Sequence, residues 1–146
     1  MKRFKFRLQR VLDFKTTLKK ESERELARRN GELHSAERRA EEILEEQDKA
    51  KLESQGTVTA AELLLHGNYQ ARLREVLIEQ RLMVLQAARA VEDARDAYLE
   101  KAIETETLEN VKEQRHTEHK EEAQREVRKE VDEMVVQRYR FRKNSN

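Results

Sequence analysis

Apolar residues recur every three or four positions along the first third of the chain. Alternating steps of four and three from Leu8 reach thirteen positions, and eight of these are apolar. The positions are Leu8, Leu12, Lys15, Lys19, Ser22, Leu26, Arg29, Leu33, Ala36, Ala40, Ile43, Gln47 and Ala50. Such a heptad seam is typical of a helix that packs against another helix. The pattern predicts a first helix over about residues 4–54.

The periodicity breaks between about residues 55 and 68, which we expect to form the tip of the fold. Gly56 is a plausible stop for the first helix. Thr59 and Glu62 have the spacing of a capping box, which begins a helix. The following short helix is expected to end at Gly67 and Asn68.

A second seam follows the tip. Its positions are Leu73, Leu77, Gln80, Val84, Ala87, Val91, Ala94, Tyr98, Lys101, Thr105 and Leu108, and the stripe resumes at Ala123, Val127, Val131 and Met134 or Val135. No Pro or Gly interrupts it, so it predicts a second helix over about residues 69–140. The expected fold class is all-α: a long antiparallel two-helix coiled coil, or helical hairpin, with a short helix or loop at the tip. We expect one coiled-coil domain over residues 1–146.

The second helix should be longer than the first by roughly 20 residues, an overhang of about 30 Å. The most polar part of the chain, residues 111–125, is where we expect this overhang. Lysines at two successive positions of the first seam indicate that the hairpin is loose near its open end.

The composition supports a narrow helical seam rather than a globular core. Charged residues make up 42% of the chain and apolar residues 36%, below the roughly 45–50% of globular proteins. Extensive disorder is the alternative, but the net charge of only +1 and the periodic apolar residues argue against it. A two-helix hairpin offers no pocket for catalysis, and no phosphate-binding glycine motif is present. We therefore expect no enzymatic activity, no small-molecule substrate and no cofactor.

Candidate metal ligands are sparse. Without Cys, thiolate sites and disulfides are excluded. His116 and His119 are three residues apart and would share a helix face, but two ligands are too few without a third, and surface histidines are the simpler interpretation. No apolar run resembles a signal peptide or a membrane span, so a cytoplasmic location is expected.

Both ends of the chain combine cations with aromatic rings. Lys2, Arg3, Lys5, Arg7 and Arg10 surround Phe4 and Phe6, and Arg138, Arg140, Arg142 and Lys143 surround Tyr139 and Phe141. When these nine cations are set aside, 22 bases and 30 acids remain, so the body carries a net charge of −8. Cations with rings could bind nucleic acid or a membrane surface. The acidic body would repel a polyanion, so docking to an acidic, partly apolar protein partner is favoured.

The opening FKFRLQRVLDFK, the middle LLLHGNYQARL and the ending KEVDEMVVQRYRFRK together resemble the flagellar type III export protein FliJ family. The middle contains the Tyr69-Gln70 pair of the family, and the ending contains Asp132-Glu133 before the basic-aromatic tail. The resemblance implies an antiparallel coiled coil similar to the central stalk of rotary ATPases. The stalk proteins of virulence secretion systems are a close alternative.

The resemblance also implies partners. The ends would insert into the hexameric flagellar export ATPase, and the chain would contact the membrane export gate protein and escort export chaperones, at the cytoplasmic face of the inner membrane. The implied ATPase-docking residues are Arg3, Phe4, Phe6, Leu8, Leu12, Asp132, Glu133, Arg138, Tyr139, Phe141 and Arg142. The implied gate-docking residues at the tip are Leu64, Leu65, Tyr69, Gln70 and Leu73, although these apolar residues could instead fold back and cap the seam. The alternative function is a nucleic-acid-binding hairpin that uses the basic-aromatic ends.

Overall fold

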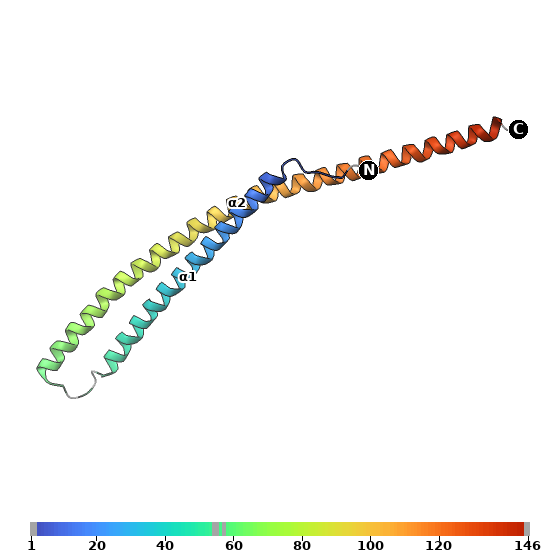
Figure 1. Ribbon diagram of the computed structural model, residues 1–146. Coiled ribbons are helices and arrows are strands. Elements are labelled where there is room, and N and C mark those ends of the chain that lie inside the picture. The colour runs from blue at the N-terminus through green and yellow to red at the C-terminus, as the bar shows by residue number, and fades with distance from the viewer. Residues whose placement is uncertain (1–2, 54–55, 57, 145–146) are drawn as a thin grey trace. The chain divides into compact units, whose positions relative to one another are not determined.

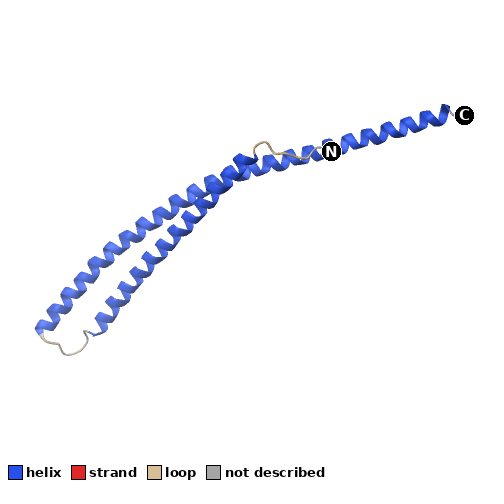
Figure 2. Ribbon diagram, viewed as in Figure 1, coloured by secondary structure: helices blue, strands red, loops and turns tan. Residues whose placement is uncertain are grey.

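Two long helices make up almost the whole protein. The computed structural model describes residues 3–53, 56 and 58–144, and contains α1 (Gln9–Glu53) and α2 (Ala60–Asn144) (Figure 1). The described residues contain no strand, as Figure 2 shows. The two helices pack against each other, which confirms the predicted helical hairpin.

The seam lies where the heptads place it. Every predicted seam position from Leu12 to Ala50, and from Leu73 to Leu108, is buried or half-buried. Polar residues within the seam form cross-helix bonds: the Gln80 side chain donates to the Ala36 carbonyl at 3.1 Å. Thr105, only 1% exposed, donates to the Lys15 carbonyl at 3.3 Å, and the Lys15 ammonium bonds Glu104 at 2.7 Å. These partners explain how a lysine is accommodated in the seam.

The chain divides into two compact units, and each helix contributes to both. One unit contains residues 18–101, with the tip and most of the seam. The other contains residues 1–17 and 102–146, with both basic-aromatic ends.

The tip is shorter than expected, because α2 begins at Ala60 and runs without interruption through Gly67 and Asn68. The capping box is confirmed: the Thr59 amide donates to the Glu62 carboxylate at 2.9 Å, and the Glu62 amide donates to the Thr59 hydroxyl at 3.3 Å. A single glycine costs a helix about 1 kcal/mol relative to alanine. That cost does not end a helix whose first turn is capped and which continues for a further 77 residues beyond Gly67.

The start of α1 also differs from the expected residue 4, since the helix begins at Gln9. We call residues 3–8 the N-terminal strap. Phe4 and Phe6 alternate with Arg3, Lys5 and Arg7, and this period of two matches an extended segment rather than a helix. The two rings are half-buried and the three cations are exposed, as that period requires. At the other end, α2 continues to Asn144, slightly beyond the predicted residue 140.

Candidate functional site

The N-terminal strap lies against α2, within the unit that contains both ends of the chain. The Phe4 ring contacts His116 edge-on, with 5.0 Å between ring centroids and 62° between the planes. It also contacts His119 at 5.6 Å. A shallow groove between strap and helix is lined by both strap phenylalanines together with Val111 and Arg115 of α2.

This arrangement corrects the predicted position of the overhang. The polar stretch at residues 111–125 is not the free end of α2, because the strap covers part of it. Extended chain rises about 3.3 Å per residue, roughly twice the rise of a helix, so residues 3–6, which precede the turn at residues 7–8, reach farther along α2 than four helical residues would. The histidine pair therefore belongs to an aromatic contact. In the part of the chain that the structure describes, no group of three or more potential metal ligands occurs.

We call residues 124–144 the C-terminal overhang. All 21 of these residues are exposed, in contrast to Ala123, which is 7% exposed. The overhang carries four apolar residues that we call the apolar stripe: Val127, Val131, Met134 and Val135, each between 51% and 60% exposed. At 100° per residue these four side chains fall within about 100° of one another around the helix. The stripe was predicted as part of the seam, but α1 does not reach it.

The end of the overhang displays the basic-aromatic cluster. Tyr139 is 70% exposed and Phe141 is 77% exposed. Asp132, Glu133, Arg138 and Arg142 are exposed as well. His119, which contacts the strap, precedes Tyr139 by 20 residues, which corresponds to about 30 Å along the helix. The two basic-aromatic clusters lie on one unit but are not level, as the length difference between the helices predicts.

The remaining predicted docking residues near the start of the chain occupy three different environments. Arg3 is exposed and Leu8 is 40% exposed, so both are accessible. Phe4 and Phe6 are half-buried in the strap. Leu12 is 6% exposed and packs in the seam between the helices, so it is not part of an accessible surface.

The predicted tip residues separate into two groups. Leu64 and Leu65 are each 69% exposed and Tyr69 is 44% exposed, so they do not cap the seam. Gln70 and Leu73 are 8% and 7% exposed and belong to the seam. The structure therefore brings three of the five residues to the surface near the start of α2. Leu63, which the sequence analysis did not single out, is exposed beside them.

A second exposed apolar row on α2 was also missed. Ile78, Leu82 and Leu85 are 60%, 55% and 58% exposed. They have the same spacing of four and three as the seam, offset by one residue from Leu77. The regular spacing of this row can be seen in the sequence. It was overlooked because the seam residues of the same stretch already explain a helix there.

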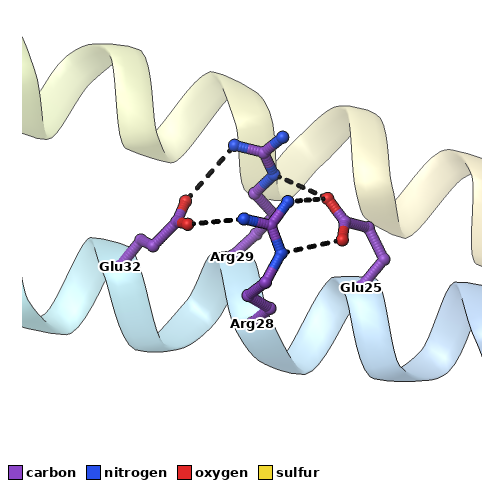
Figure 3. Close-up of polar contacts among 4 residues, drawn as sticks. All are labelled: Glu25, Arg28, Arg29 and Glu32. Carbon is purple, nitrogen blue, oxygen red and sulfur yellow. Dashed lines mark hydrogen bonds and ion pairs between the residues drawn. The ribbon is translucent and has the colours of Figure 1, made fainter.

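The clearest electrostatic feature of α1 is a four-residue ion network on its surface (Figure 3). Arg28 and Arg29 each bond both Glu25 and Glu32, at 2.6–3.2 Å. The hydrogen bond from Arg28 is the main cause that lowers the pKa of Glu25 below its ordinary value, and Arg29 acts in the same direction. The same pairing raises the pKa of Arg28. Because the network joins residues three and four apart on one helix, it stabilises α1 next to Gly31.

Neither described helix has a segment long and apolar enough to cross a membrane. Comparison with curated proteins gives no match, and comparison with solved structures gives none. A family model described as "Flagellar FliJ protein" matches residues 4–144. This match includes the strap, the tip and the overhang. The chain therefore belongs to the flagellar FliJ family, whose members are non-catalytic components of the flagellar protein export apparatus.

Proposed function

We propose that this protein is a non-enzymatic stalk of the flagellar type III export apparatus. Its ends dock into the ring of the hexameric export ATPase and stimulate it, and its tip contacts the membrane export gate protein. The observation that carries the proposal is the C-terminal overhang, a helix with an apolar stripe and a basic-aromatic end that are exposed over their whole length. A helix with one apolar face ordinarily packs that face against a partner.

The chemistry of the overhang suits a ring with an acidic mouth and an apolar interior. Arg138 and Arg142 would steer the helix toward acidic residues. The stripe and Tyr139 would provide the surface that becomes buried. The strap adds Phe4 and Phe6, which already lie against α2 and would enter the ring together with it.

The tip suits the second contact. Leu64, Leu65 and Tyr69 are exposed on consecutive turns at the start of α2, in the unit that does not contain the chain ends. One chain can thus present separate surfaces to the ATPase and to the gate. Through these two partners it would lie at the cytoplasmic face of the inner membrane. Escort of export chaperones is proposed from family membership alone.

Two matched variants test the proposal, because each is the control for the other. A chain that ends at residue 136 should lose binding to the purified export ATPase and should no longer stimulate ATP hydrolysis, while it still binds the gate. The variant Leu65→Ser with Tyr69→Ser should lose gate binding and keep full ATPase stimulation. Circular dichroism checks that both variants remain helical.

Three results would contradict the proposal. The shortened chain could stimulate the ATPase as strongly as the full chain, which would make the C-terminal cluster a simple tail. The tip variant could lose helix content together with gate binding, which would assign Leu65 and Tyr69 a structural role. Steeply salt-dependent binding to generic DNA, with no ATPase binding, would favour the nucleic-acid alternative.

A further inference from the structure

The C-terminal overhang has features that fit a second copy of itself. From Val127 the apolar stripe advances by four residues to Val131 and by three to Met134, which is the spacing of core positions in a coiled coil. No residue of α1 covers it, since all residues from 124 to 144 are exposed. In proteins most of the stability of a helix comes from the packing of its apolar face rather than from helix propensity. A packing partner would therefore stabilise the free overhang.

The charges along this part of α2 indicate which partner orientation is favourable. Residues 121–133 carry six acids and three bases, Glu121, Glu122, Glu126, Glu130, Asp132 and Glu133 against Arg125, Arg128 and Lys129. Residues 138–143 carry four cations and no acid. A parallel pair would align the four cations of one copy with the four of the other. An antiparallel pair would instead place each basic end beside Glu121, Glu122 and Glu126 of the other copy.

We propose that two free chains pair antiparallel through their C-terminal overhangs. In an antiparallel coiled coil the two kinds of core position face each other, so Val131 of one copy packs against Met134 of the other. In this register Glu121 of each copy lies next to Arg142 of the other copy. The pair therefore has two such contacts, one near each end and both beside the core. In the single chain Glu121 has an exposed contact with Arg125, 3.4 Å apart, which is readily exchanged.

The interface is short, which makes the pair weak and reversible. The stripe from Val127 to Val135 spans about 12 Å of helix, and even with the charged flanks the contact is far smaller than that of a permanent dimer. The same stripe is the surface proposed above to enter the ATPase ring. Self-pairing would therefore cover it in the free chain and would be displaced on docking.

Analytical ultracentrifugation of the full-length chain alone, at low ionic strength and over a wide concentration range, tests this inference without the ATPase. We expect a reversible monomer–dimer equilibrium. Glu121→Arg and Arg142→Glu should each weaken dimerisation by about five- to tenfold, because each reverses two symmetric pairs. The double variant with both changes should restore dimerisation to near the original strength. Added salt should weaken the original dimer.

Lys129→Glu is the matched control, since Lys129 lies on the opposite side of the helix from the stripe. It should change dimerisation by less than twofold. A monomer at all concentrations would overturn the inference. So would a double variant as weak as the single ones, or a control that weakens the dimer as much as Arg142→Glu does. A chain that remains monomeric yet still stimulates the ATPase would leave the proposed function standing while refuting the self-pairing.

Discussion

At the scale of single residues, Gly31 and Gly67 lie inside helices in ordinary right-handed backbone conformation. Neither has a positive φ, and a Cβ added at either position meets nothing within 4 Å. Alanine should therefore fit at both positions without strain. Gly31→Ala and Gly67→Ala should each raise the free energy of unfolding by about 1 kcal/mol, because alanine has the higher helix propensity.

Urea denaturation followed by circular dichroism measures this effect. The two sites are far apart in the hairpin, so the double variant should show the sum of the two changes. A destabilised Gly67→Ala variant would show that Gly67 does not lie in a regular helix, and the sequence-based expectation of a helix end at Gly67 and Asn68 would then be correct.

The ion network around Glu25 gives a prediction for pH. The pKa of Glu25 is lowered in the folded chain, first by its hydrogen bond from Arg28. A lowered carboxylate pKa means that the stabilisation is present above the ordinary pKa of glutamate and is lost as the pH falls through the lowered value. Since the four side chains keep 36–54% of their surface accessible to solvent, the contribution is small and screened by salt. NMR titration should find that the Glu25 pKa rises toward its ordinary value in Arg28→Gln.

A Glu25 pKa that is equal in both proteins would contradict this assignment. High salt should also reduce the lowering of the Glu25 pKa, more in the original chain than in the variant, where only Arg29 still pairs with Glu25.

Residue-level features were the most predictable from the sequence. The capping box at Thr59 and Glu62 depends only on a spacing of three residues, and it is present with both hydrogen bonds. The seam positions depend only on heptad spacing, and they are buried or half-buried from Leu12 to Ala50. The partners of the polar seam residues were not predictable. The contact of Lys15 with Glu104 depends on the register between two helices, which a periodic pattern in each helix does not define.

At the scale of elements, the two helices were predictable but their ends were not. Apolar and cationic residues alternate with a period of two near the start of the chain. The predicted helix nevertheless included this segment, because the heptad pattern begins at Leu8. The extended strap is stabilised by contacts with His116 and His119, more than a hundred residues away in the chain. A sequence pattern cannot reveal such a contact. The strap lies against part of the polar stretch of α2, and α2 is exposed at every residue only from residue 124 onward, rather than from near residue 111.

For the candidate site, too, one part could be predicted from the sequence and another could not. The basic-aromatic composition of both ends is evident in the sequence, and so are the leucines at the tip. Exposure decides which of these residues can bind a partner, and exposure follows from the helix boundaries. Leu12, Gln70 and Leu73 match the family pattern as well as their neighbours do, but all three lie in the seam. Leu64, Leu65 and the apolar stripe remain accessible.

At the scale of the whole molecule, the charge distribution separates an acidic body from basic ends. The nine terminal cations balance a body with a net charge of −8, so the chain as a whole is close to neutral. Long-range attraction to an acidic partner therefore acts on the ends rather than on the protein as a whole. Such attraction acts before contact, whereas apolar side chains contribute only once they are buried. The two features should affect different steps of docking.

We therefore expect charge and apolar variants of the overhang to change different rate constants of ATPase binding. Arg138→Glu with Arg142→Glu should slow association by about tenfold and reduce its salt dependence, because surface charges steer the encounter. Tyr139→Ala with Val131→Ala should leave association nearly unchanged and speed dissociation, because buried anchors hold the complex together. Stopped-flow or surface-based kinetics at two salt concentrations would measure both effects, at chain concentrations low enough to keep the free protein monomeric. If the charge reversal changed only dissociation, Arg138 and Arg142 would be anchors inside the ring rather than steering residues at its mouth.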